Sequence, residues 1–89
     1  MIEKEEGFGL VKMLRDPRLS MKSKGLLTYL YKCPEGTDVT VEYIRNDTCD
    51  GRIAITSAIN ECIEAGYLEK FRTRHPNGNL GEYKWILKI

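Results

Sequence analysis

Residues 52–78 read RIAITSAINECIEAGYLEKFRTRHPNG, and this stretch decides the fold. Its first half predicts a helix over about 52–65, because apolar residues recur there at the spacing i, i+3, i+4 and i+7. These residues are Ile55, Ala58, Ile59 and Cys62. Gly66 follows in the position where a glycine commonly ends a helix. The pattern then becomes strand-like, and Asn77-Gly78 is a strong signal for a hairpin turn. A helix followed by a β-hairpin indicates an α+β fold.

The elements on either side of this stretch are predicted from caps and periodicity. Ser20 is a helix N-cap candidate, and the leucines after it predict a helix over about 21–32. Thr40 is the next cap candidate, for a short helix over 41–46. Two strands, over about 67–74 and 83–89, are expected to form the hairpin. This order of three helices and a C-terminal hairpin is that of a winged helix-turn-helix.

The N-terminal residues give a weaker pattern. Residues 1–7 are expected to form a disordered tail, and the apolar run 8–14 predicts a strand or an extended arm. Pro17 disfavours helical backbone at the residue before it, which ends this run. Gly25, inside the first predicted helix, weakens it by about 1 kcal/mol relative to alanine, so a close helix–helix approach is expected there.

Length and composition limit the class of protein. With 89 residues, 42% hydrophobic and 30% charged, the sequence has the make-up of one ordinary globular domain, residues 1–89. It has no apolar run long enough to span a membrane and no signal-peptide core at its start. The three cysteines form no CxxC motif, which argues against a disulfide scaffold or a zinc knuckle. We therefore expect a cytoplasmic protein whose cysteines act as small apolar core residues.

Catalysis has little support in the sequence. The one histidine, His75, lies in the predicted hairpin turn, where solvent surrounds it, and no glycine-rich phosphate loop follows a strand. Asp47 and Asp50 have the chemistry of cation ligands, but capping and turn roles explain them better. No enzyme activity, small-molecule substrate, metal or cofactor is therefore predicted.

The charges form opposed blocks although the net charge is only +1. Residues 8–34 carry six basic residues and one acidic residue, whereas residues 35–50 carry one basic and five acidic residues. Residues 69–89 are again basic, with five basic and two acidic residues. Such blocks allow one basic face and one acidic face, although they also occur as ordinary solvated surface.

One face of the helix predicted at 52–65 carries polar side chains suited to DNA bases. Opposite its buried stripe lie Arg52, Ile53, Thr56, Ser57 and Asn60. Arginine can donate two hydrogen bonds to guanine, asparagine can pair with adenine, and an apolar side chain can meet the methyl group of thymine. The alternative reading is a solvated helix face, which is polar in any protein of this kind.

A second cluster lies on the first strand of the predicted hairpin. Lys70, Arg72 and Arg74 alternate with other residues, so all three project from one face of that strand. Like charges so placed repel one another unless an anion lies between them, and a phosphate backbone is such an anion. The alternative is a charged edge strand that resists aggregation.

Basic residues also surround the start of the helix predicted at 21–32. Lys22 and Lys24 lie in its first turn, and Arg15 and Arg18 come shortly before it. Cations at this end oppose the helix dipole, which a surface tolerates but which phosphate contacts would also explain. Arg18, Lys22 and Lys24 are therefore candidate contacts to a DNA backbone.

Three stretches together resemble a known group of winged helix-turn-helix domains. Residues 14–27, LRDPRLSMKSKGLL, are similar to the opening "LRDxRLSxKAKGLL" of domains from phage, plasmid and integrative-element proteins of Gram-positive bacteria. Residues 50–59, DGRIAITSAI, continue the similarity, and residues 64–68, EAGYL, resemble its "EexGYL" bridge between helix and wing. The resemblance implies a DNA-binding domain of a replication-initiation (DnaD-like) protein, or else of a transcription regulator. It also implies that Arg52, Thr56 and Asn60 face the groove and that Arg72 and Arg74 belong to the wing.

The sequence therefore predicts a domain that binds double-stranded DNA without catalysis, through the helix at 52–65 and the basic hairpin. Binding as a homodimer is left open. The alternative is a protein-interaction domain, in which Tyr43, Ile53, Tyr83 or Trp85 form an exposed apolar patch and the hairpin edge pairs with a second copy.

Overall fold

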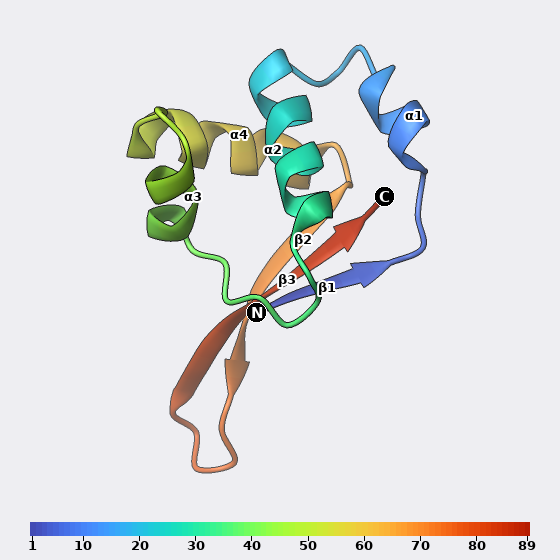
Figure 1. Cartoon of the computed structure of the whole chain (residues 1–89). Coiled ribbons are helices and arrows are strands. Elements are labelled where there is room, and N and C mark those ends of the chain that lie inside the picture. The colour runs from blue at the N-terminus through green and yellow to red at the C-terminus, as the bar shows by residue number, and fades with distance from the viewer.

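The computed structural model describes all 89 residues as one compact α+β fold with four helices and a three-stranded mixed sheet (Figure 1). In chain order the elements are β1 (Ile2–Glu5), α1 (Leu10–Leu14), α2 (Met21–Lys32), α3 (Val41–Asp47), α4 (Arg52–Glu64), β2 (Leu68–Arg74) and β3 (Leu80–Lys88). The α+β class predicted from the sequence is confirmed. Each of the helices is too short or too polar to cross a membrane.

The sheet has the order β1-β3-β2, with β1 parallel and β2 antiparallel to β3. The helices cover one face of the sheet near the chain ends, and the β2–β3 hairpin extends beyond them (Figure 1). In the hairpin, Lys70 lies opposite Trp85 and Arg72 lies opposite Tyr83. Directly opposed residues share a face of a sheet, so these two basic side chains lie on the face that carries Trp85.

The predicted disordered tail at residues 1–7 is wrong, because Ile2–Glu5 forms strand β1 along β3. Ile2 is fully buried, donates its N–H to the carbonyl of Thr37 and accepts a hydrogen bond from Gly36. The strand is short and mostly charged, and its partner lies about eighty residues away in the chain. The strand propensity of residues 2–5 does not predict such a long-range pairing.

The strand or arm predicted at residues 8–14 is also wrong, because Leu10–Leu14 forms helix α1. Gly9 begins the turn with a φ of 89°, and the N–H of Met13 donates to its carbonyl at 3.1 Å. Met13 is completely buried, whereas Val11 and Leu14 remain exposed. A short apolar run fits a strand and a helix equally well, and here tertiary packing of Met13 selects the helix.

The other helices begin and end close to where the sequence predicts. The hydroxyl groups of Ser20 and Thr40 accept hydrogen bonds from the N–H groups of Ser23 and Tyr43, at 3.2 and 3.0 Å. Gly66 ends α4 with a φ of 87°, a conformation that favours glycine. The predicted buried stripe of α4 is confirmed, since its four residues are all at most 4% exposed.

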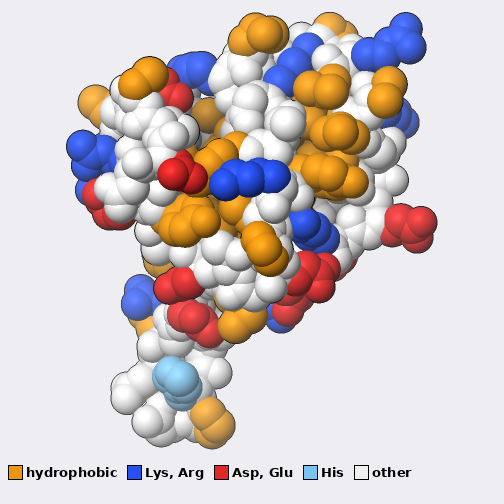
Figure 2. Space-filling model, viewed as in Figure 1, with side chains coloured by type: hydrophobic (Ala, Val, Ile, Leu, Met, Phe, Trp, Pro, Cys, Tyr) orange, Lys and Arg blue, Asp and Glu red, His pale blue; other side chains and the backbone are white.

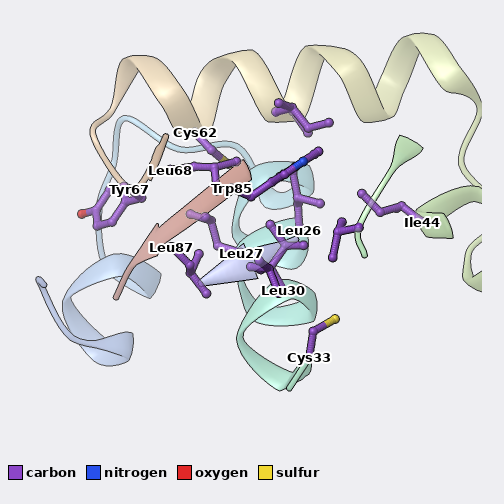
Figure 3. Close-up of a cluster of buried hydrophobic side chains, with 14 of the residues drawn as sticks. Leu26, Leu27, Leu30, Cys33, Ile44, Cys62, Tyr67, Leu68, Trp85 and Leu87 are labelled. Carbon is purple, nitrogen blue, oxygen red and sulfur yellow. The ribbon is translucent and has the colours of Figure 1, made fainter. Parts of the chain in front are cut away.

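The core lies between the helices and the covered face of the sheet. Figure 3 shows Trp85 and Leu87 of β3 pointing toward Leu26, Leu27 and Leu30 of α2. Cys33 and Cys62 belong to this cluster, as expected, but Cys49 is exposed and is not a core residue. The difference arises because Cys49 lies in the turn between α3 and α4, whose residues do not pack into the core.

A buried carboxylate ties the loop before α2 to the start of the hairpin. The Asp16 carboxylate accepts hydrogen bonds from the Arg18 guanidinium and from the Tyr67 hydroxyl, each at 2.7 Å. The Arg18 bonds first, and the Tyr67 bond second, hold the pKa of Asp16 well below its usual value. Folding therefore favours the charged form of this carboxylate.

We expect this group to make stability depend on acid pH. A lowered folded-state pKa contributes stability that is complete above the unfolded value near 4 and is lost as the pH falls below it. Urea unfolding between about pH 6 and pH 2 should show a smaller acid loss of unfolding free energy in Asp16→Asn than in the wild type. Asp50→Asn, at an exposed residue, is the control. Equal acid losses in the wild type and Asp16→Asn would contradict this role.

Gly25 does not mediate a close helix–helix approach within the chain, contrary to the expectation from sequence. A Cβ atom built on it meets no atom within 4 Å, and the residue is exposed. We therefore expect Gly25→Ala to raise the unfolding free energy by about 0.5–1 kcal/mol, because alanine loses less backbone entropy in a helix. Thermal unfolding followed by circular dichroism measures this. A lower midpoint would show that glycine is required in the isolated fold.

Candidate nucleic-acid interface

The predicted contact residues of α4 lie together on its solvent face. Arg52, Ile53, Thr56, Ser57 and Asn60 are all exposed and, with Glu61 and Glu64, line one shallow, open depression. Ile53 is 87% exposed, an unusual value for an isoleucine in a helix. This placement follows from the buried stripe on the opposite side, which fixes how the helix is turned.

Charge on this face changes sign along α4. Arg52 in the first turn forms an ion pair with Glu42 of α3, so its guanidinium is already occupied by a carboxylate. Glu61 accepts a hydrogen bond from the Ser20 N–H, which holds the pKa of its carboxyl below the usual value. With Glu64 it makes the last turns acidic. An anionic ligand is therefore disfavoured at the last turns, which leaves the first two turns of α4 as the place for one.

The hairpin carries three exposed basic residues without a carboxylate partner: Lys70, Arg72 and Arg74 take part in none of the ion pairs of the structure. The Lys70 Nζ lies 4.7 Å from the ring centre of Tyr83 and 5.0 Å from that of Trp85. The Arg72 guanidinium lies 5.2 Å from the Tyr83 ring and donates to the Gly81 carbonyl at 2.9 Å. Aromatic rings and carbonyls hold these groups without neutralising their charge.

Arg74 lies farther along the hairpin, beyond an irregularity in the β2–β3 register. Its guanidinium donates only to the Gly78 carbonyl in the turn, at 3.4 Å. The three basic side chains therefore run from the edge of the core to the tip of the hairpin.

The opposite face of the same hairpin is neutralised. Lys84 pairs with Glu3 at 2.9 Å, and Lys88 pairs with Glu69. The bond to Glu69 raises the pKa of Lys88. The unpaired charges of Lys70 and Arg72 thus lie on the face that also carries the helices.

The basic residues around the start of α2 differ in whether their charges are free to contact a ligand. Arg18 is held by Asp16 through two guanidinium nitrogens, so it has a structural role in the fold. Lys22 is exposed and Lys24 half-buried, and neither forms an ion pair. The three residues that the sequence grouped together therefore separate into one structural arginine and two free lysines.

The apolar patch of the interaction hypothesis does not form as a unit. Trp85 is 1% exposed and Tyr43 is half-buried, because both pack into or against the core. Ile53 and Tyr83 are exposed, on α4 and the hairpin. Tyr83 instead contacts the two basic residues Lys70 and Arg72, a role that sequence analysis missed. The feature that predicts this contact is the register of the hairpin, which places Tyr83 opposite Arg72.

No three side chains of His, Cys, Asp or Glu lie close enough to one another in the fold to hold a metal ion. Asp47 accepts a hydrogen bond from the Tyr29 hydroxyl at 2.8 Å and lies 3.6 Å from the Lys32 ammonium.

Comparison of the chain with protein-family models, with curated proteins and with solved structures found no match.

Proposed function

We propose that this chain is a winged-helix domain that binds double-stranded DNA and catalyses no reaction. In this proposal α4 lies in the major groove and the β2–β3 hairpin is the wing on the adjacent backbone or minor groove. The order of α2, α3, α4 and the hairpin supports the fold assignment. The role that we propose, on the resemblance of residues 14–27, is replication initiation of a mobile element, with transcriptional regulation as the second possibility.

The observation that carries the proposal is the unpaired positive charge along strand β2. Three cations at alternate positions of β2 have no carboxylate within 4 Å, whereas the lysines on the other face are paired. A closely spaced row of cations is stabilised by an anion that spans it, and a phosphate backbone carries closely spaced negative charges. The aromatic side chain of Tyr83 keeps two of these groups in place before DNA arrives.

The helix supplies the groups for base contacts. Thr56, Ser57 and Asn60 offer donors and acceptors on the exposed face, and Ile53 offers an apolar contact for a thymine methyl group. Because Glu61 and Glu64 repel phosphates, the N-terminal half of α4 is the part that we expect to enter the groove. The lysines at positions 22 and 24 are available for further backbone contacts.

A salt titration tests this function. Fluorescence anisotropy of a labelled mixed-sequence duplex is measured at several salt concentrations between about 50 and 200 mM. We expect binding whose affinity falls steeply with salt, with a slope that corresponds to several phosphate contacts. A chain that fails to bind at the lowest salt, and instead dimerises as its concentration rises, would be an interaction domain.

The ion pair between Arg52 and Glu42 leads to a further prediction. Glu42→Gln should raise DNA affinity about two- to fivefold, because Arg52 no longer has to leave a carboxylate to contact DNA. Glu35→Gln removes the same charge at a distance from α4 and controls for the change in net charge. The same anisotropy assay measures both variants. Equal gains from both would mean that only the net charge matters and that Arg52 is not a contact residue.

A further inference from the structure

The outward face of α2 carries a groove that shares only Lys22 and Lys24 with the proposed DNA interface. It runs along the helix past Gly25 and Thr28 and is bordered by Leu14 of α1 and Tyr29. Beside it, a largely apolar cavity of about 350 Å³ opens between α2, α3 and α4, with Leu26, Ile44 and Ala54 in its wall. Gly25, Met21 and Tyr29 border both, so groove and cavity form one continuous surface, which we call the α2 groove.

Apolar side chains stand exposed at this groove. Met21 is 84% exposed and Leu14 is 43% exposed. Figure 2 views this side of the molecule and shows hydrophobic and basic side chains gathered over α1 and α2, with acidic ones mostly toward the sheet and α3. Exposed apolar side chains bordering an apolar cavity are typical of a surface that a partner covers.

Gly25 is a second observation that indicates a surface covered by a partner, and it is independent of the exposed apolar side chains. A glycine in the middle of α2 weakens the helix by about 1 kcal/mol relative to alanine. Nothing inside the chain requires it, because a Cβ atom there would meet open space. The absence of a side chain lowers the floor of the groove at its centre, which lets the backbone of another helix approach α2 closely.

Charge identifies the kind of partner. The only ionisable side chains along the groove, apart from the phenol of Tyr29, are those of Lys24 and Lys32, and Lys22 lies at the mouth of the cavity. Lys22 and Lys24 have no carboxylate partner in the chain. Asp50 is the one acidic residue at the cavity, on the far side toward α3. Lys32 is paired with Asp47, so the free charge that a helix in the groove meets is that of Lys22 and Lys24.

We propose that the α2 groove binds an acidic amphipathic helix of a partner protein, which crosses α2 at Gly25 and inserts one large apolar side chain into the cavity between α2, α3 and α4. The volume suits one aromatic or leucine side chain together with the groups that flank it. A second copy of this chain is a poorer occupant, because a two-fold contact of α2 with itself would set Lys24 against Lys24. The proposal does not depend on DNA binding by α4 or the hairpin.

The test uses synthetic helical peptides of about 18 residues, long enough to form a helix on binding. Three peptides carry Leu, Phe or Trp as the central anchor, further leucines at i, i+3, i+4 and i+7 spacing, and glutamates on both flanks. Three counterparts carry lysine at every glutamate position. Each peptide is titrated into the ¹⁵N-labelled full chain and followed by NMR.

We expect at least one acidic peptide to shift the amide signals of Met21, Gly25 and Ala54, with a dissociation constant well below about 1 mM. Its lysine counterpart should bind at least about tenfold more weakly, because it faces lysines. Acidic peptides that do not bind by about 1 mM, that bind no better than their counterparts, or that shift residues elsewhere would overturn the proposal. Signals of the groove that move with protein concentration alone would instead assign it to a second copy.

Two variants separate this surface from the fold and from DNA binding. Gly25→Leu fills the groove from a helix position with open space above it, so it should weaken the acidic peptide at least tenfold without lowering the unfolding midpoint. Asn46→Leu adds the same side chain to an exposed position of α3 and should leave peptide binding unchanged. Unchanged peptide affinity in Gly25→Leu would overturn the proposal even if a peptide binds. Neither residue belongs to the proposed DNA interface, so failure of one proposal is distinguishable from failure of the other.

Discussion

Trp85→Ala is expected to lower the free energy of unfolding by about 3–5 kcal/mol, enough to unfold much of a domain of this size. The indole is 1% exposed and belongs to the core cluster beneath α2. Trp85 also lies opposite Ile2 of β1 and opposite Lys70 of β2, at the centre of the sheet. Its removal therefore leaves a cavity where all three strands and the helices meet. Urea unfolding followed by circular dichroism measures the loss.

Trp85→Phe is the matched variant for this position. It keeps an aromatic ring in the core and should lose clearly less stability than the alanine variant, because part of the cavity stays filled. An alanine variant that unfolds cooperatively within about 1 kcal/mol of the wild type would contradict the central position of Trp85 in the fold.

The triple change Lys70→Ala, Arg72→Ala and Arg74→Ala is expected to weaken DNA binding by about two orders of magnitude near 0.1 M salt. Each lost phosphate contact lowers the slope of log affinity against log salt by about 0.9, so the slope should fall by up to about three units. The fold should persist, since all three side chains are exposed. Anisotropy titrations of wild type and variant across salt concentrations give both quantities.

The hairpin itself provides the control. Lys84→Ala with Lys88→Ala removes two positive charges from the other face, where both lysines are paired with glutamates. This double variant should keep most of the salt dependence and lose little affinity. Equal losses per charge in the two variants would show that DNA responds only to net charge and that the hairpin has no DNA-binding face.

The helices α2, α3 and α4 and the hairpin could be predicted because their signals are local. Ser20, Thr40 and Gly66 mark helix ends through their own hydrogen bonds or backbone, and the i, i+3, i+4 spacing in α4 fixes its buried side. Strand β1 could not be predicted, because it depends on pairing with β3 at the other end of the chain. For α1 the apolar run was ambiguous, and the burial of Met13 decided it.

In the candidate site too, some features follow from the local sequence pattern and others need the tertiary structure. Alternation along β2 correctly grouped Lys70 and Arg72 on one face, since that depends only on the period of a strand. The partners of the basic groups needed the tertiary structure: Asp16 holds Arg18, and Glu42 holds Arg52. A glycine inside a helix predicts a close approach but not its partner, and only the tertiary structure shows that the space above Gly25 is open.

NMR mapping of a short DNA duplex onto the ¹⁵N-labelled protein decides whether α4 and the hairpin form one DNA-binding surface. At low salt, we expect the amide signals of Ile53, Thr56 and Asn60 to shift together with those of Lys70 and Arg72. Signals on the paired face of the hairpin, such as that of Lys84, should move little. Shifts that spare α4 and the hairpin, or that spread over Lys84 and Lys88 as strongly as over Lys70 and Arg72, would contradict the proposed function.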